Sequence, residues 1–313
     1  PLAVGALLLA VLTLIAAETW KDYKSTLINS QTQQMELVVQ SISDSIRFSL
    51  EEYTDRLDAA AGKLRENPSQ PLNLSRSDSI TDLWVEDAEG NIVYSRYGVR
   101  LVCDVLLTQD GKISYWQYHQ GDHHYLVLKE PVDDRAVCLV VDSEAVYDQL
   151  VSDIHVGTNG YIVIKTADNR IVMHPEPAQW GIDILEGRRK LYQQYKLDMS
   201  SLAELLAAQL TQPSGIMTYY SYWWTDPDLP RVQKISAFRK LELGNSFWTV
   251  SAVVDYDDLY QPVARSFRKM AGMFCVIAGI MALLTLLLFR LQKKNNRNAA
   301  RITALQEVNT ALE

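Results

Sequence analysis

The chain has 313 residues, a formal net charge of -8 at pH 7, and a composition that is 48% hydrophobic and 22% charged. That length suits two compact modules plus further segments, and the acidic balance argues against a nucleic-acid-binding surface. Three cysteines are too few for a disulfide-rich scaffold, and none has the CxxC spacing of a structural zinc site. We therefore expect no nucleic-acid partner, no bound metal and no cofactor.

Two runs without charged side chains lie near the ends of the chain, at residues 1–17 and 271–289. A bilayer core needs about 20 apolar helical residues. The second run nearly meets this length alone. The chain starts at Pro1 rather than Met, so we expect the first run to be a truncated transmembrane helix. A cleaved signal peptide is the alternative for the first run, and a buried core helix is the alternative for the second.

Basic residues after the second run predict its orientation. They are Arg290, Lys293, Lys294, Arg297 and Arg301, with no acidic residue before Glu307. An excess of lysine and arginine marks the cytoplasmic side of a membrane span. Because basic residues also precede the run within 265–269, the contrast is moderate. We predict a two-pass protein of the cell membrane, with residues 18–269 outside the cytoplasm.

The sequence directly after the first run predicts one long extracytoplasmic helix, residues 18–66. Apolar residues recur there at helical spacing, and Asn67-Pro68 ends the pattern because proline cannot continue a helix. Residues 67–79 then form a polar linker.

The rest of the external sequence contains one pattern twice. Each copy has a hairpin that returns on Ile-Val (83–94 and 161–174), an aromatic strand pair, and Val-Val-Asp followed by a helix start (140–147 and 253–260). Each copy therefore reads as an antiparallel sheet of about five strands. A helical insertion, residues 198–210, occurs only in the second copy. The predicted fold class is α+β: a long N-terminal helix and two antiparallel-sheet subdomains between two transmembrane helices.

The most specific stretch is GTNGYIVIKTADNRIVMHP, residues 157–175. A G-x-x-G-Y segment followed by a turn and a strand ending in His-Pro is typical of the membrane-proximal half of a double Cache sensor domain. The chain resembles such domains of bacterial transmembrane receptors over about residues 19–260. The resemblance implies two PAS-like subdomains, membrane-distal at 67–150 and membrane-proximal at 151–262. It also implies a small extracellular ligand, usually in the distal half, and a conformational change passed through the second span.

One subset of the family is not matched. Double Cache domains that bind amino acids carry an Arg-x-Trp motif in the distal half, and no arginine between Arg76 and Arg135 has Trp two residues later. Asp142 does stand where that subset has an aspartate that holds the ligand amine. One element of several gives little support for an amino acid, so we expect a cationic or neutral ligand.

Four distal residues form the predicted binding site: Trp116, Tyr118, Tyr125 and Asp142. Trp116 and Tyr118 share one strand face, Tyr125 lies on the partner strand, and Asp142 ends the next strand. Aromatic walls offer contact area, and a carboxylate offers a charge-assisted bond. In the proximal half Asp255 is followed by two further acids and reads as a helix cap, so we place the site distally. The alternative is that the aromatic residues are sheet core.

Two further features each allow a functional interpretation and a plainer one. His119, His123 and His124 surround a turn and could ligate a metal, but an exposed turn is the favoured interpretation. Cys103 and Cys138 lie in the same external half, where disulfides persist; a disulfide and two separate buried thiols are equally compatible with the sequence.

Residues 290–313 predict a polar coiled-coil-like helix that leads to an output domain beyond the chain. Leu305, Val308 and Leu312 have the 3,4 spacing of a two-helix seam, which predicts a homodimer. The sequence has no phosphate loop, GxSxG or HExxH motif. The leading interpretation is the sensing part of a histidine kinase that acts on a cytoplasmic response regulator. The alternatives are the input of a diguanylate cyclase or chemoreceptor, and a membrane-tethered binding protein without signalling output.

Overall fold

The computed structural model describes residues 2–67, 72, 79–151, 154 and 160–310. The chain divides into two units. Residues 1–30 and 260–313 form a helical unit, and residues 31–259 form a central unit that contains all of the β-strands. Two helices cross from one unit to the other along the chain: α1 (Leu2–Glu66) and α5 (Tyr256–Thr310).

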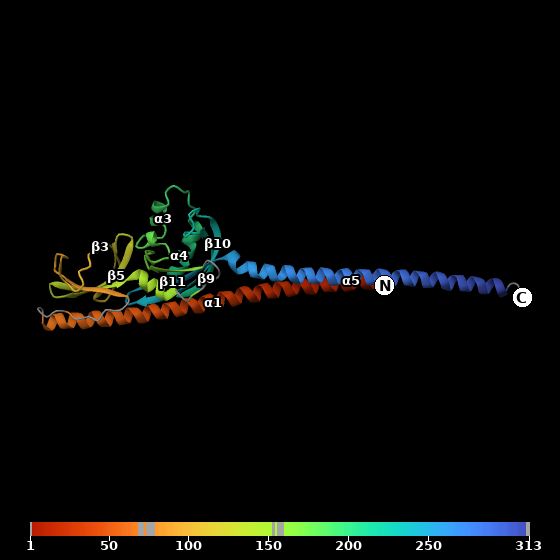
Figure 1. Ribbon diagram of the computed structural model, residues 1–313, viewed down its shortest axis with the longest axis horizontal. Coiled ribbons are helices and arrows are strands. Elements are labelled where there is room, and N and C mark those ends of the chain that lie inside the picture. Colours follow the sequence, from red (N-terminus) through yellow and green to blue (C-terminus); the bar gives the residue numbers. More distant parts are fainter. Residues whose placement is uncertain (1, 68–71, 73–78, 152–153, 155–159, 311–313) are drawn as a thin grey trace. The chain divides into compact units, whose positions relative to one another are not determined.

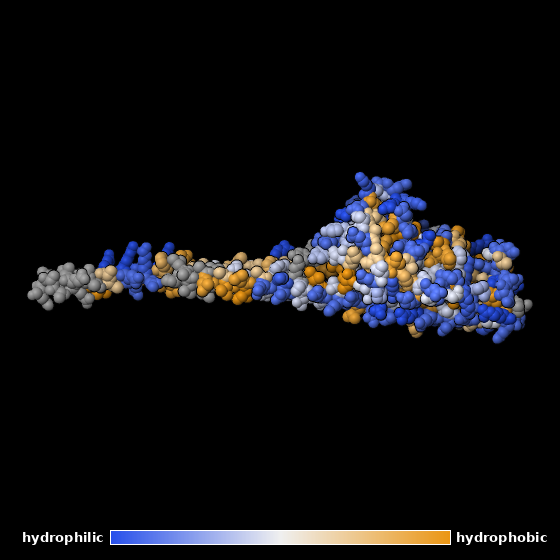
Figure 2. All heavy atoms as spheres, turned by 180° about the vertical axis from the view of Figure 1, so that it is seen from behind, coloured by the Kyte–Doolittle hydropathy of each residue, from blue (hydrophilic) through white to orange (hydrophobic). Residues whose placement is uncertain are grey.

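In the helical unit, α5 carries the residues that suit a membrane span. Its segment Ala264–Ile302 contains an 18-residue stretch with a mean hydropathy of 2.6, none of it buried, and among the described residues it is the one segment that passes as a span by length and composition. Figure 2 shows hydrophobic residues gathered along the helical part of the chain. The rings of Trp20 on α1 and Phe267 on α5 have centroids 3.8 Å apart. Residues 2–17 are helical as part of α1, and their role as a first span stays a prediction.

The predicted long helix is confirmed, and α1 supplies one layer of the central unit. Apolar residues of α1 recur every three or four positions and are buried: Met35, Val39, Ile42, Ile46, Leu50, Tyr53, Leu57 and Leu64. They join one core with residues from both sheets, and Figure 1 shows the orange part of α1 running beside the strands. The amide of Asn67 donates to Lys63 O (3.0 Å) and closes the last turn.

The first copy of the repeat forms a six-stranded antiparallel sheet, the distal sheet, with strand order β2-β1-β6-β5-β4-β3. Its strands are β1 (Ile80–Glu86), β2 (Ile92–Ser95), β3 (Val102–Asp110), β4 (Ile113–Gln120), β5 (His123–Val132) and β6 (Arg135–Asp142). Helix α2 (Ser143–Val151) follows β6 directly. The sequence reading missed β3, whose register against β4 shifts twice; two irregularities break the strict alternation by which a strand is recognised.

The second copy forms a five-stranded antiparallel sheet, the proximal sheet, with order β8-β7-β11-β10-β9. Its strands are β7 (Tyr161–Thr166), β8 (Ile171–Met173), β9 (Ser214–Tyr222), β10 (Arg231–Leu243) and β11 (Ser246–Asp255). Apart from the edge strand β3, both sheets have the same order: a hairpin, the last strand, then the two strands before it. This shared topology confirms that the sequence pattern is a structural repeat.

The proximal half alone has helices inserted between β8 and β9. They are η1 (Pro177–Gln179), α3 (Glu186–Leu191) and α4 (Ser200–Thr211), and α4 confirms the predicted helical insertion. Buried α4 residues such as Leu202 and Leu206 pack with Tyr219 and Phe238 of the sheet. Since the alternate residues of these strands face α1, the proximal sheet is covered on both faces.

The two sheets share one core. Trp248 of β11 is 0% exposed, and its indole Nε1 donates to the Thr108 hydroxyl of β3 across 2.8 Å. The ring of Tyr115 on β4 meets it edge-on, with centroids 5.7 Å apart. A tryptophan of the proximal sheet therefore lies inside the distal half, and both belong to one hydrophobic cluster.

Both predicted hairpin turns form as the sequence indicates. In the first, Gly90 has φ 82°, and in the second Asn169 has φ 67°; glycine and asparagine are the residues that adopt this left-handed conformation most readily. Thr166 and Arg170 close the second turn, with the Thr166 amide donating to Arg170 O (2.8 Å).

Cys103 and Cys138 are both free thiols, so the disulfide interpretation is wrong. The alternative of two buried thiols holds for Cys138 alone, because Cys103 is exposed. Cys103 lies on β3 and Cys138 on β6, with β4 and β5 between them. Three strand spacings amount to about 14 Å, twice the separation that a disulfide can bridge. The predicted linker, residues 67–79, lies mostly outside the described residues.

Candidate ligand-binding sites

Strand pairing brings three of the four predicted distal residues into one row. Tyr118 of β4 lies opposite Tyr125 of β5, which lies opposite Asp142 of β6. Trp116 is two residues before Tyr118 and projects to the same face. That face is the one turned away from α1, where Trp84 meets Tyr118 edge-on at 5.9 Å between centroids. The four residues therefore share one face; whether they hold a ligand stays a prediction.

A lysine already lies on the aromatic part of this face. The Lys129 ammonium is 5.1 Å from the Trp116 ring centroid and 5.0 Å from that of Tyr118. It is paired with Glu86 across 2.9 Å, and Glu86 also accepts from the Trp84 indole. Ring faces attract cations, and here the chain supplies one itself. Tyr125 and Asp142, at the other end of the row, are thus the freer part of the wall.

Asp142 caps a helix and contacts the side chain of His123. Its Oδ1 accepts from the Ala145 amide (3.0 Å) at the start of α2 and lies 3.0 Å from His123 Nε2. In the proximal half, Asp255 accepts from the Asp257 amide (2.9 Å) at the start of α5. The two aspartates have the same capping role, so the sequence-based contrast between a binding Asp142 and a capping Asp255 is wrong. Asp142 differs instead by its histidine and by its aromatic row.

The three histidines near the β4–β5 turn face three different surroundings. His119 Nδ1 lies 2.6 Å from Asp104, whereas His123 is held between Asp142 and Glu144. His124 stacks on Trp180, with centroids 5.3 Å apart, and burial lowers the pKa of its imidazole. Within the described ranges no group of three potential ligands is arranged to hold a metal ion.

The proximal half contains a small, partly open cavity that the sequence analysis did not identify. Its volume is about 30 Å³, and it lies between the proximal sheet and helices α3 and α4. The lining combines apolar side chains with polar and charged ones: Tyr161, Val163, Lys165, Ile184, Arg188, Leu202, Leu205, Leu206, Gln209, Tyr219, Trp224, Ser236, Ser251 and Val253. The inserted helices form one side of this space by covering a face of the proximal sheet; among the described residues, the distal half has no helices inserted between its strands.

Three basic side chains are buried around this cavity: Lys165, Arg188 and Lys234. The Arg188 guanidinium donates from Nε to Gln179 Oε1 (2.8 Å) and stacks 4.3 Å from the Trp224 ring centroid. Burial lowers its pKa below the usual arginine value. Sequence reasoning missed Arg188 because it stands in an Arg-Arg-Lys run, which resembles a solvated helix face.

Lys234 and Lys165 have neutral partners. Lys234 is 0% exposed; its ammonium donates to the Tyr161 hydroxyl (3.1 Å) and to Tyr222 O (2.5 Å). Lys165 donates to Asn169 Oδ1 (2.9 Å), and burial lowers its pKa to about 8. Lys165 shares a strand face with Tyr161 and Val163, and Lys234 shares one with Phe238. These apolar neighbours on the same face were a sequence signal that the two lysines face a covered side.

A second tryptophan, Trp180, links the two halves beside these sites. Trp180 follows η1 and donates from its indole to His174 O (2.6 Å) in the proximal half. Its ring stacks on His124 of β5 and meets Tyr147 of α2 edge-on. The preceding residue, Gln179, is the one that holds Arg188.

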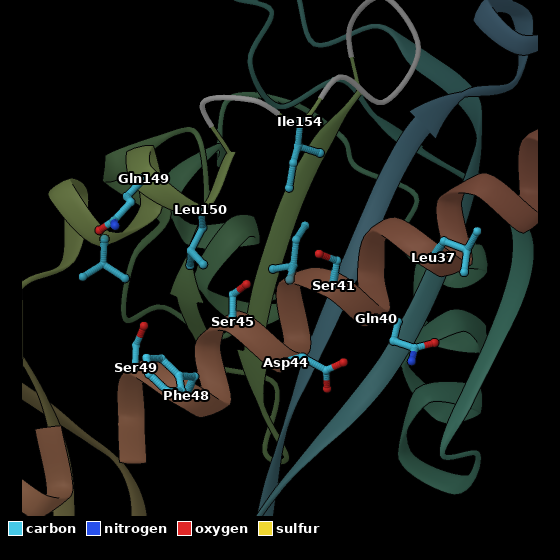
Figure 3. A pocket seen from close by; sticks show the side chains of 12 residues that line it. Leu37, Gln40, Ser41, Asp44, Ser45, Phe48, Ser49, Gln149, Leu150 and Ile154 are labelled. Carbon is cyan, nitrogen blue, oxygen red and sulfur yellow. The ribbon is translucent and has the colours of Figure 1, made fainter. Parts of the chain in front are cut away.

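A groove of about 750 Å³ lies between α1 on one side and α2 with Ile154 on the other, within the central unit. Figure 3 shows side chains of α1 projecting beside Leu150 of α2 and Ile154. Two of them, Leu37 and Phe48, are large, apolar, and exposed to 66% and 70%. They are 11 residues apart, which is close to three full turns, so both lie on one stripe of the helix.

No protein-family model and no curated protein matches the sequence. Among solved structures, the ligand-binding domain of the Pseudomonas fluorescens chemoreceptor CtaA in complex with L-serine matches with a TM-score of 0.51 and 13% identity, covering 73% of this chain and 99% of that one. The ligand-binding domain of the Pseudomonas aeruginosa chemoreceptor PctB in complex with L-Arg matches with a TM-score of 0.49 and 14% identity, covering 73% of this chain and 96% of that one. The periplasmic sensory domain of the Campylobacter jejuni chemoreceptor Tlp1 matches with a TM-score of 0.48 and 12% identity, covering 75% of this chain and 99% of that one.

At these sequence identities the similarity is evidence for the fold alone. We base it on the CtaA domain, whose TM-score is 0.51. The long helix, the two antiparallel sheets and their order in the chain agree with that domain over most of this chain. The described central unit therefore has the fold of a double Cache sensor domain.

Proposed function

We propose that this chain is the extracytoplasmic sensing and membrane-spanning part of a bacterial receptor. The observation that carries the proposal is a sensor-domain fold whose last strand leads straight into the apolar helix. Helix α5 begins at Tyr256, directly after β11 ends at Asp255. Because no loop separates strand and helix, a displacement of the proximal sheet on ligand binding would act on the start of α5.

We further propose a histidine kinase with a cytoplasmic response regulator as the output. A chemoreceptor or a diguanylate cyclase uses the same kind of input, and chemoreceptor domains are among the proteins with this fold. A tethered binding protein without output is a third reading of the same chain. The fold supports the sensing role and is compatible with each of these outputs.

The proposed topology has two spans, with residues 18–269 outside the cytoplasm. It predicts that a membrane-impermeant thiol reagent labels Asp122→Cys in intact cells, whereas Asn298→Cys reacts only after permeabilisation. Both positions are exposed, at the β4–β5 turn and on α5. The background carries Cys103→Ser and Cys275→Ala, while buried Cys138 is retained. Labelling of Asn298→Cys but not of Asp122→Cys in intact cells would overturn the topology.

We propose that the sensed ligand contacts Trp116, Tyr118, Tyr125 and Asp142. The registered row of the last three supports this placement, and the carboxylate favours a ligand with an amine or hydroxyl group. Asp142→Ala is expected to weaken binding roughly tenfold, the loss of one charge-assisted bond. A thermal-shift screen of amines and polyols on the whole chain in detergent supplies the ligand.

Asp255→Ala is the matched control for this prediction, because it removes the same kind of helix cap from the other half. Both variants lose about 1 kcal/mol of stability with the cap, but only Asp142→Ala should lose affinity. Equal affinity of both variants for the screened ligand would refute the distal placement.

We also propose that the chain works as a homodimer. The groove beside α1 supports this, because Leu37 and Phe48 are exposed within one chain, with the polar residues Ser41 and Asp44 between them. A symmetric dimer places the same surface on both partners. The second predicted seam, in residues 290–313, stays a prediction, and its Leu312 lies outside the described residues.

A further inference from the structure

Arg188 is a buried cation without a counter-ion among the described residues. It is 3% exposed, its Nε donates to the neutral amide of Gln179 (2.8 Å), and its guanidinium stacks on Trp224. Asp183 attracts the guanidinium from a distance, but Asp183 Oδ1 accepts from two backbone amides near the start of α3. Burying a cation without an anionic partner is costly, so the surroundings of Arg188 lack one negative charge.

The two other buried cations of the proximal half can lose their charge, whereas Arg188 cannot. Burial lowers the pKa of Lys165 to about 8 and that of Lys234 well below its usual range. Both ammonium groups also donate to neutral oxygen atoms. A guanidinium keeps its proton in a protein. The charge that needs compensation in this half is therefore that of Arg188.

The terminal nitrogens of Arg188 also lack a hydrogen-bond acceptor. The Glu176 amide donates to His174 Nδ1 (3.0 Å), so the proton of the neutral ring is on Nε2. That Nε2 lies 3.4 Å from Arg188 Nη2, so two donors face each other. Burial and the two nearby cations lower the pKa of His174 well below its usual range and keep the ring neutral. In the described part of the chain, no oxygen accepts from either terminal nitrogen of Arg188.

The cavity between the proximal sheet, α3 and α4 lies against this guanidinium and presents unused polar atoms. Ser236 Oγ and Gln209 Oε1 are buried and have no hydrogen-bond partner among the described residues, and both residues line the cavity together with Arg188. Buried polar groups are nearly always paired. Gln209 Nε2 lies 3.1 Å from Ser251 Oγ; with the amide turned over, Oε1 accepts from the Ser251 hydroxyl and Nε2 becomes a free donor.

The size of the cavity selects the kind of anion. Its volume of about 30 Å³ is close to the share of one water molecule in the liquid. A polyatomic anion does not fit this space, whereas a monatomic halide is little larger than a water molecule. A water molecule would satisfy the donors but leave the charge of Arg188 uncompensated. A halide does both.

We propose that the proximal cavity binds one chloride ion as the counter-ion of Arg188. The ion accepts from the Arg188 guanidinium, the Ser236 hydroxyl and the Gln209 amide. These donors belong to α3, β10 and α4, so the ion ties both inserted helices to the proximal sheet. The site is separate from the Tyr118–Tyr125–Asp142 row and depends neither on the distal ligand nor on the output domain.

The test is thermal unfolding of the whole chain in detergent while sodium chloride replaces sodium gluconate at constant ionic strength. We expect the melting temperature to rise and to saturate, by roughly 3–6 °C at about ten times the dissociation constant. Bromide should act like chloride, because it is also a monatomic halide. The chlorine NMR line should be broadened by the chain and narrowed again by added bromide, which measures binding directly.

Two variants with matched controls locate the ion. Arg188→Gln should abolish the difference between chloride and gluconate, whereas Arg189→Gln should keep it, since Arg189 is half exposed and pairs with Glu186 on the surface. Ser236→Ala should raise the dissociation constant of chloride about tenfold, the loss of one hydrogen bond to a charged partner. Ser221→Ala should leave it unchanged, because Ser221 also has a buried, unpaired hydroxyl in the proximal sheet but does not line the cavity.

The pair Ser236→Ala and Ser221→Ala decides the question if Arg188→Gln does not fold. The proposal is overturned if chloride and gluconate give the same melting temperature and the chlorine line stays narrow. It is equally overturned if the folded cavity variants respond to chloride as the unaltered chain does.

Discussion

Replacing Trp248 with alanine is expected to lower the free energy of unfolding by about 3–5 kcal/mol, the usual loss for a large aromatic residue removed from a core. Trp248 is fully buried between the sheets, so the alanine leaves a void that α1 and two rigid sheets cannot fill. The indole hydrogen bond to Thr108 is lost at the same time. Chemical unfolding of the chain in detergent, followed by far-ultraviolet circular dichroism, measures the difference.

Trp248→Phe is the control for the hydrogen bond. It keeps most of the packing but leaves the Thr108 hydroxyl without its indole partner, which should cost about 1–3 kcal/mol. We expect Trp248→Ala to be clearly the worse of the two. If both variants unfold like the unaltered chain, the two sheets do not depend on this contact.

Phe48→Glu is expected to raise the dissociation constant of the proposed homodimer about tenfold to a hundredfold. Covering an exposed phenylalanine stabilises an interface by roughly 1.5–3 kcal/mol, and a carboxylate in its place adds a desolvation cost; each 1.4 kcal/mol is a tenfold change in Kd. Sedimentation velocity of the whole chain in detergent, over a range of protein concentrations, gives the dissociation constant of both forms.

Leu210→Glu is the matched control for Phe48→Glu, because Leu210 is also a large exposed apolar residue, at 54%, but lies on α4 of the proximal half. It should leave the association unchanged. A Phe48→Glu chain that dimerises as tightly as the Leu210→Glu chain would show that the α1 groove is not the seam.

The repeated fold could be predicted because its signals are local. The hairpin turns depend on residues that tolerate φ above zero, such as Asn169, and the Val-Val-Asp segments end buried strands at the same spacing in both copies. Strand β3 could not be predicted in this way, because its residues meet β4 with two register shifts. Pairing at a sheet edge is a tertiary interaction, so the local pattern of residues 102–110 does not predict it.

The candidate sites show the same limit. The distal row was predicted from alternation along β4 and from the order of the strands, and the register agrees. The cavity around Arg188 could not be predicted, since it exists only because α3 and α4 fold back over the sheet. The capping role of Asp142 was also missed. Asp142 and Asp255 end equivalent strands, and both cap the helix that follows although the residues after them differ.

Trp180 gives the two sites a thermodynamic relationship. It stacks on His124, whose neighbour His123 holds Asp142, and it follows Gln179, which holds Arg188. A molecule bound in one half that shifts Gln179 or the neighbouring indole would therefore change the surroundings of the other half. Linkage is reciprocal: whatever factor binding in the proximal half applies to the distal affinity, the distal ligand must apply to binding in the proximal half. The response of a receptor built in this way depends on both halves together.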